Sequence, residues 1–228
     1  SGMWQIKFPD KYVRYFDVPQ NYQSDLGGQY YINELQILRN DLAQLAGRAI
    51  SDDDLRESTR VYNENRRVID QLYQYRAAKP WQVPTAELYL LLRAGMLLPV
   101  EEYTQMLRDY LVATEAEPRP VRDNCRVVVT GMFCEQPPLG LIKSIEMAGC
   151  YIVDDDFMLV TRWLLQDVPL EGDPLYNLSE AFLKHSAETA AKFVVRREDK
   201  GRFLIDSVRH NRAEGVVFAA PSFCDPAL

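Results

Sequence analysis

Hydrophobic positions recur at helical spacing through the first half of the chain. Between residues 32 and 45, apolar side chains follow one another every three or four positions, which predicts a helix with one apolar stripe. Ser51 is expected to cap a second helix, because the acids at 52–54 then lie in its first turn, where the helix dipole favours negative charge. Similar stripes continue to a polar, proline-bearing joint at 114–123. Residues 21–123 are therefore predicted to form a helical linker section.

Beyond this joint, short apolar runs alternate with helical stretches. Residues 126–131, 151–153 and 215–218 are rich in β-branched side chains, as buried strands are. Strands that alternate with helices predict a parallel, doubly wound sheet. We therefore expect residues 124–228 to form a carboxy-terminal α/β domain of Rossmann or flavodoxin type. Helices are expected over residues 139–148, 158–165, 179–192 and 198–213.

The amino-terminal residues give a different signal. Residues 12–19 alternate between polar and apolar side chains and end at Pro19, which predicts a strand followed by a turn. No helix or partner strand precedes this segment in the sequence. We therefore interpret residues 1–20 as the trailing edge of a truncated amino-terminal α/β domain.

The predicted strands of the α/β domain end in residues that can carry chemistry. Gly131 to Cys134 follow the first strand, Asp154 to Asp156 the second, and Ala220 to Cys224 the third. In an open parallel sheet these carboxyl ends lie along one edge, and ligands bind just beyond that edge. The sequence therefore predicts the functional site at this edge.

Composition argues against several classes of protein. The chain of 228 residues has a formal net charge of −7 and an isoelectric point near 5.0, which argues against nucleic-acid partners and against docking on an anionic membrane. No run reaches the roughly 18 apolar residues of a membrane span. The four cysteines form no CxxC pair, and no secretion signal is visible, so we expect reduced thiols in a cytoplasmic protein.

Several kinds of site are possible at the strand edge. The loop Thr-Gly-Met-Phe-Cys-Glu-Gln-Pro-Pro lacks the glycines that bring a dinucleotide pyrophosphate close to the backbone. A cysteine nucleophile needs a base, and both His185 and His210 fall on predicted helices away from the strand ends. Structural zinc needs about four Cys or His ligands. Cys224 as an iron–sulfur ligand competes with simple packing, the usual role of an isolated cysteine.

Four motifs resemble the benzoyl-CoA reductase and 2-hydroxyacyl-CoA dehydratase family. They are Val-Val-Val-Thr-Gly at 127–131, Ile-Val-Asp-Asp-Asp at 152–156 with Arg162, Glu-Gly-Val-Val-Phe at 214–218 and Phe-Cys-Asp-Pro at 223–226. The helices from Ile50 to Arg76 are similar to the linker helices of this family. The segment at 153–163 is most similar to the smaller cluster-bearing subunits of the reductases, because the dehydratases more often carry cysteine and glycine where this chain has Phe157, Met158 and Leu159.

This resemblance implies a [4Fe-4S] cluster held by three cysteines, of which the third matches Cys224. The other two have no counterpart here, so the resemblance implies a fragment that begins just after the second ligand and ends just after the third. Cys134 would lie beside the cluster or simply pack. Asp154, Asp155 and Arg162 are candidates for shaping the substrate region, with helix capping and a surface ion pair as the alternatives.

The resemblance also implies a reaction and partners. ATP-hydrolysing activator subunits, with ferredoxin as the electron source, would serve the cluster, and a homologous core subunit of the B type would pair with this one. The ring of benzoyl-CoA would be reduced one electron at a time. Two alternatives stay open: a subunit of a 2-hydroxyacyl-CoA dehydratase, which eliminates water by a radical route, and a non-catalytic scaffold or assembly subunit. The chain alone is expected to bind no stable cluster and to be inactive.

Overall fold

The protein has an α/β fold in which a helical part is joined to a small parallel sheet. The computed structural model describes residues 2–131, 137–157, 162–187, 201–220 and 222. Its helices are α1 (Gly2–Lys7), a π-helical turn η1 (Ser24–Gly28), α2 (Gln29–Ala46), α3 (Asp52–Ala78), α4 (Thr85–Ala94), α5 (Val100–Ala116), α6 (Leu139–Met147), α7 (Pro174–His185) and α8 (Arg202–His210). Its strands are β1 (Cys125–Thr130), β2 (Cys150–Asp155) and β3 (Gly215–Phe218).

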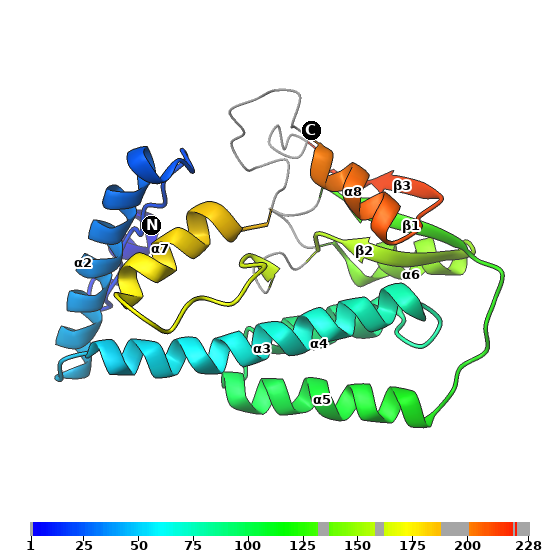
Figure 1. Cartoon of the computed structure of the whole chain (residues 1–228), viewed down its shortest axis with the longest axis horizontal. Coiled ribbons are helices and arrows are strands. Elements are labelled where there is room, and N and C mark those ends of the chain that lie inside the picture. Colours follow the sequence, from blue (N-terminus) through cyan, green and yellow to red (C-terminus); the bar gives the residue numbers. More distant parts are fainter. Residues whose placement is uncertain (1, 132–136, 158–161, 188–200, 221, 223–228) are drawn as a thin grey trace.

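Helix α3 runs the length of the molecule. Figure 1 shows α2 and α7 at one end, the sheet at the other, and α3 beneath both. The hydroxyl of Ser51 accepts a hydrogen bond from the N–H of Asp54, whose side chain accepts one from the N–H of Ser51, so a capping box begins the helix as predicted. In the part of the chain that the structure describes, no helix is both long and apolar enough to cross a membrane.

The sheet is parallel, with the strand order β2-β1-β3. Val127 of β1 lies opposite Ile152 on one side and Gly215 on the other. The pairing with β2 shifts register after Val127, where the ladder is irregular. Because the chain leaves β1 toward β2 on one side and returns to β3 on the other, the topological switch point lies between β1 and β3. The predicted parallel arrangement is confirmed.

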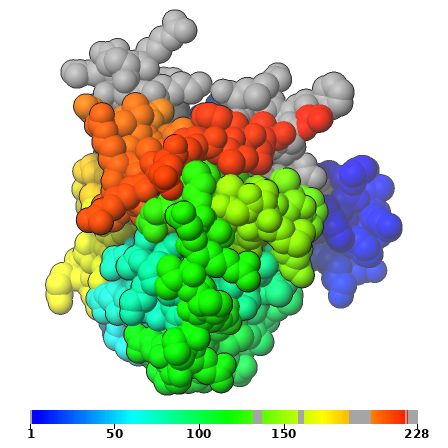
Figure 2. Space-filling model, turned by 90° about the vertical axis from the view of Figure 1, so that its right-hand side faces the viewer, coloured from blue at the N-terminus to red at the C-terminus, as the bar shows by residue number. Residues whose placement is uncertain are grey.

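One hydrophobic core joins the helices to the sheet. Leu72 of α3, Leu107 of α5 and Val129 of β1 belong to the same cluster, and each is 0% exposed. Figure 2 views the molecule from the sheet end and shows the strands and α6 resting directly on the helices below. Residues 117–124 link α5 to β1 without helix or strand. The division into units at 1–20, 21–123 and 124–228 stays a prediction.

The strand predicted over residues 12–19 is wrong. This segment contains no strand and follows α2 instead. The Tyr12 hydroxyl and the Arg14 guanidinium donate hydrogen bonds of 2.7 and 2.8 Å to Asp41 of α2. Side chains that reach alternately toward a helix and toward solvent produce the same period-two pattern as a half-buried strand.

Two predicted helices also differ from the structure. Residues 162–165, the described part of the helix expected at 158–165, contain no α-helix, and Leu164 pairs with Ser186 in an isolated bridge. The helix expected from Ser179 begins earlier, because the Asp173 carboxylate accepts two backbone hydrogen bonds as the N-cap. Ser179 is a buried residue in the interior of α7.

Candidate functional site

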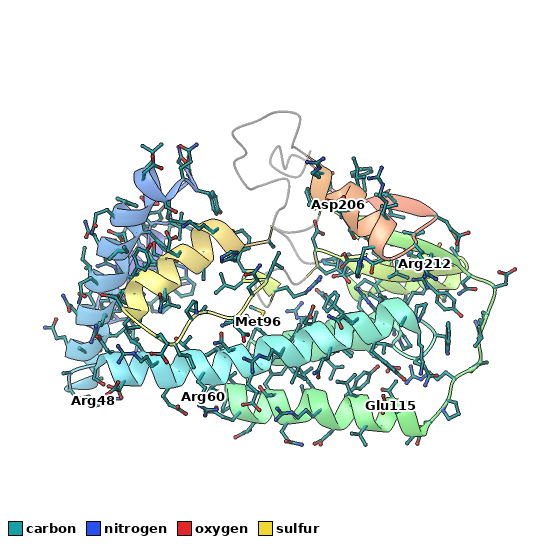
Figure 3. All side chains as sticks on the ribbon, viewed as in Figure 1. Arg48, Arg60, Met96, Glu115, Asp206 and Arg212 are labelled. Atoms are coloured by element: carbon teal, nitrogen blue, oxygen red, sulfur yellow. The ribbon has the colours of Figure 1, made fainter. Side chains whose placement is uncertain are left out.

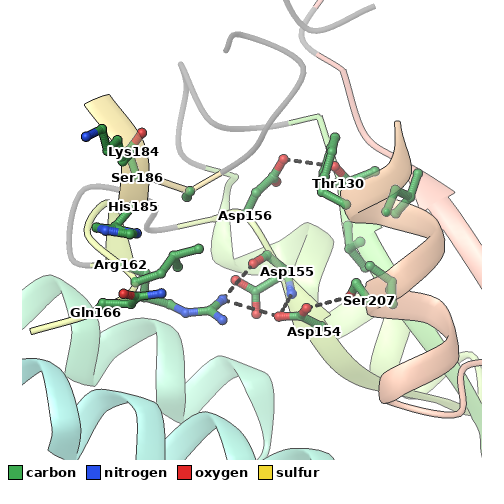
Figure 4. Close-up of a pocket in the computed structure, with 16 residues that line it drawn as sticks. Thr130, Asp154, Asp155, Asp156, Arg162, Gln166, Lys184, His185, Ser186 and Ser207 are labelled. Atoms are coloured by element: carbon green, nitrogen blue, oxygen red, sulfur yellow. Dashed lines mark hydrogen bonds and ion pairs between the residues drawn. The ribbon is translucent and has the colours of Figure 1, made fainter. Parts of the chain in front are cut away.

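A cavity of about 310 Å³ opens at the carboxyl edge of the sheet. Figure 4 shows polar side chains from several elements around it. They are Thr130 from β1, Asp154 and Asp155 from β2 with the following Asp156, Arg162 and Gln166 from the next segment, Lys184, His185 and Ser186 at the end of α7, and Ser207 from α8. A concave site at this edge is where open α/β sheets bind ligands. Cys134 and Cys224 lie outside the described residues, so their predicted roles stay predictions.

Asp155 anchors the end of β2 to α3. Its Oδ2 lies 2.7 Å from Nη1 of Arg76, and the two side chains are 1% and 0% exposed, although the groups are not aligned as a hydrogen bond. The hydroxyl of Tyr73 and the N–H of Phe157 each donate a 3.1 Å hydrogen bond to Oδ1. Burial raises the pKa of Tyr73 far above its ordinary value, so this hydroxyl stays a donor. The role of Asp155 is thus an interior ion pair, and not a helix cap or a surface pair.

Asp154 and Arg162 form a second pair at the wall of the cavity. Their side-chain atoms lie 3.2 Å apart and are 21% and 23% exposed. The Arg162 guanidinium also lies 3.5 Å from the ring centroid of Tyr73, and the Ser207 hydroxyl donates a 2.5 Å hydrogen bond to Asp154. Burial raises the pKa of Asp154, but Arg162 and Ser207 lower it by more, so it lies below its ordinary value. The structure therefore brings these two predicted candidates together as a charged pair.

Asp156 ties the ends of β1 and β2 together. Its Oδ2 accepts hydrogen bonds of 3.0 Å from the Thr130 hydroxyl and 2.8 Å from the N–H of Gly131. Gly131 has a φ of 107°, and a Cβ there would lie 3.4 Å from the backbone of Ala219, so the turn requires glycine. Sequence reasoning did not single out Asp156 as a site residue. The Thr-Gly pair that ends one strand and the acid that ends the next were the available signal.

His185 lies in this cavity, and the expectation that it lies away from the strand ends is wrong. Helix α7 ends at His185, and the backbone beyond it pairs with the segment after Arg162. The N–H of Leu165 donates a 2.9 Å hydrogen bond to the His185 carbonyl. The exposed His185 side chain is therefore a titratable group beside the Asp154–Arg162 pair. His210, in contrast, does not line this cavity.

The described cysteines do not supply a metal site at this edge. Cys125 and Cys150 lie opposite each other at the amino ends of β1 and β2. At 3.3 Å per residue, that is about 17 Å from the carboxyl edge. Among the described residues, no group of three or more His, Cys, Asp or Glu side chains is placed to hold a metal ion. The ligand set of a [4Fe-4S] cluster is therefore not found in this part of the chain.

Comparison with known proteins places the chain in a family. All of residues 1–228 match the family described as 2-hydroxyglutaryl-CoA dehydratase, D-component. The chain is 60% identical over 228 residues to one of the subunits of the benzoyl-CoA reductase of Thauera aromatica, and 28% identical over 227 residues to lactoyl-CoA dehydratase subunit beta of Anaerotignum propionicum. It is 24% identical over 231 residues to (R)-2-hydroxyglutaryl-CoA dehydratase subunit beta of Acidaminococcus fermentans.

These matches cover nearly the whole chain but not the whole of each relative. They include 100%, 99% and 99% of this chain, against 59%, 59% and 60% of the respective relatives. The chain thus spans about three-fifths of the length of the curated relatives that it matches. The resemblance inferred from the strand-end motifs is confirmed, and the chain belongs to the 2-hydroxyglutaryl-CoA dehydratase D-component family.

Proposed function

We propose that this chain is part of a core subunit of an ATP-dependent benzoyl-CoA reductase, an oxidoreductase that reduces the aromatic ring of benzoyl-CoA. The observation that carries this proposal is the 60% identity, over all 228 residues, to a benzoyl-CoA reductase subunit. Identity to the two dehydratase beta subunits is less than half as high, at 28% and 24%. Because these relatives are named as subunits, the proposal includes a hetero-oligomer, with a homologous core subunit of the B type as the partner.

The proposal also includes a [4Fe-4S] cluster, ATP-hydrolysing activator subunits and ferredoxin as the electron source. Cys224 would be one ligand, since it follows β3, and β3 borders the topological switch point of the sheet. The remaining ligands would come from protein outside these 228 residues. When bound, such a cluster supplies single electrons at low potential.

The described residues would hold the edge at which the thioester binds. Asp155 fixes β2 to α3 through Arg76, and Asp156 joins the ends of the two neighbouring strands. Arg162, held over the Tyr73 ring, presents a guanidinium to the cavity. A fixed positive charge favours a thioester carbonyl oxygen that gains negative charge as the ring is reduced.

A second candidate is a subunit of a 2-hydroxyacyl-CoA dehydratase. The family is described by a dehydratase component, and 99% of this chain aligns with lactoyl-CoA dehydratase subunit beta. The same strand edge would then serve radical elimination of water from a hydroxyacyl thioester.

Substrate competition in the assembled enzyme tests the choice between these candidates. The full-length subunit, its partner and the activator would be supplied with ATP, reductant and either benzoyl-CoA or lactoyl-CoA under anaerobic conditions. We expect ATP-dependent consumption of benzoyl-CoA. Turnover of the hydroxyacyl thioester alone would overturn the proposal in favour of the dehydratase.

A matched pair of cysteine variants tests the ligand assignment. Cys224→Ser should lower the iron content of the full-length subunit below the roughly four irons of one cluster. Cys125→Ser should leave the iron content unchanged, because Cys125 lies at the opposite end of β1. Full retention of iron by Cys224→Ser would remove Cys224 from the ligand set.

A further inference from the structure

A second cavity, of about 400 Å³, lies between the helical part and the segment that follows β2. Side chains of α3, the link from α4 to α5, the first turn of α5 and the segment after Arg162 line it. In Figure 3, Met96 marks its position beside the middle of α3. It shares no lining residue with the cavity at the carboxyl edge of the sheet.

Three buried hydrogen-bond donors at this cavity lack an acceptor. Tyr103 is 2% exposed, and its hydroxyl has no hydrogen-bond partner among the described residues. The same holds for the indole N–H of Trp163 and for Nε of Arg66. Buried polar groups are nearly always paired, so three unpaired donors around one cavity indicate a missing acceptor.

The local backbone leaves room for the phenol end of Tyr103. A Cβ at Gly95 would lie 2.5 Å from Cε1 and 2.6 Å from Cζ of the Tyr103 ring. Gly95 and Tyr103 both line the cavity, so the ring atoms next to the hydroxyl lie at its wall. The close approach that glycine permits holds this unpaired hydroxyl at the cavity.

The charge of the lining favours an anion. Arg66 is the charged member of the lining, and no Asp or Glu among the described residues lines the cavity. Burial lowers the pKa of Arg66, with Asp167 acting in the opposite direction, but the ion pair of Asp167 is formed with Arg67. Arg66 itself donates to the neutral side chain of Asn63. Its guanidinium therefore has unused capacity to bind a carboxylate.

The remaining walls favour an apolar, flat ligand body. Leu98, Val100 and Leu164 contribute aliphatic surface, and Tyr62 adds an aromatic ring to those of Tyr103 and Trp163. Cavities with mostly apolar walls and a few converging polar groups are typical small-molecule sites. Aromatic rings of protein and ligand also gain from stacked or edge-to-face contact.

We propose that this cavity binds a small aromatic carboxylate. The carboxylate oxygens accept hydrogen bonds from the Tyr103 hydroxyl, the Trp163 indole and the Arg66 guanidinium, and the ring lies against the aliphatic wall. The site is separate from the strand edge and does not depend on the reaction proposed there.

Titration of the purified full-length protein by calorimetry tests the chemistry of the ligand. Benzoate is the probe, and three controls each lack one feature: acetate has no ring, benzyl alcohol has no charge, and benzylamine has the opposite charge. We expect benzoate to bind at least about tenfold more tightly than each control, the effect of losing one charge-assisted hydrogen bond or more. Absence of benzoate binding at millimolar concentration, as for a cavity filled by water alone, would overturn the proposal.

Conservative variants test the location. Tyr103→Phe and Trp163→Phe should each weaken benzoate binding about tenfold, because each removes one donor to the carboxylate. Tyr110→Phe is the matched control, since Tyr110 lies on the same helix, donates its hydroxyl to Glu87 at 2.8 Å and does not line the cavity. It should leave benzoate affinity unchanged. Equal effects of Tyr103→Phe and Tyr110→Phe, or none from Tyr103→Phe, would place the ligand elsewhere.

Discussion

Replacing Arg76 by Met removes one half of the ion pair that holds β2 on α3. Both partners are buried, and the two charged groups lie 2.7 Å apart. Met retains most of the apolar stem of the arginine, so packing against the Tyr73 ring is largely preserved. The carboxylate of Asp155 keeps its hydrogen bond from Tyr73 but loses the positive charge that balances it.

The expected cost is large for a single substitution. Leaving one member of a buried ion pair unbalanced destabilises a protein by about 3–5 kcal/mol, out of a total of about 5–15 kcal/mol. At roughly 2–4 °C per kcal/mol for a chain of this size, the midpoint of thermal unfolding should fall by about 10 °C. Asp155→Asn should destabilise by a similar amount, because it leaves the Arg76 charge unbalanced. The double variant removes both charges and should recover about 2 kcal/mol of the summed cost.

Urea unfolding followed by circular dichroism measures these differences at constant m-value. Arg60→Met is the control, because the Arg60–Glu57 pair lies on the surface of the same helix, with side chains 53% and 63% exposed. It should leave the unfolding midpoint nearly unchanged. The reasoning fails if Arg76→Met is no more destabilising than this control, or if the effects of Arg76→Met and Asp155→Asn simply add.

Two further predictions concern the strand edge. The pKa of Asp154 lies below its ordinary value of 3.8, so its stabilising contribution is complete above that value and is lost as the pH falls through the lower pKa of the folded state. The stability difference between wild type and Asp154→Asn should therefore shrink between pH 5 and pH 2; a difference independent of pH would contradict the pairing with Arg162. Gly131→Ala should destabilise by about 1–3 kcal/mol because of its positive φ, whereas Gly140→Ala in the open interior of α6 should stabilise by about 0.5–1 kcal/mol. Equal unfolding midpoints for the two glycine variants would refute this assignment.

The features that sequence predicted correctly depend on local chemistry. The cap at Ser51 needs only the acid three residues later, and the strands at 126–131 and 215–218 are set by runs of β-branched residues. Alternation of strands and helices then predicted a parallel sheet, because right-handed crossovers leave few other topologies. The strand ends consequently met at one edge, with Asp154 near Thr130.

The features that sequence missed depend on contacts between distant segments. His185 reaches the strand edge because α7 is fixed by aromatic packing of Phe182 on Tyr22 and Trp163, which no spacing in the sequence indicates. Arg76 gave a clearer signal, since it lies one turn beyond Leu72 on the apolar stripe of α3. A charged residue at such a position needs a buried partner, but the partner itself cannot be identified from α3 alone.

Helix α3 has a mechanical consequence for the strand edge. With 27 residues at 1.5 Å each, it is about 40 Å long, stiffened at its first turn by the capping box. Asn63, midway along it, exchanges hydrogen bonds of 2.8 and 2.9 Å with the backbone of Val168, while Arg76 grips Asp155 near the far end. The helix is therefore a lever arm: a tilt of about 5° about one end moves the other by about 3.5 Å. A push on the α2–α7 end of the molecule is delivered to the strand edge as movement of a rigid rod, and is not absorbed by a loop.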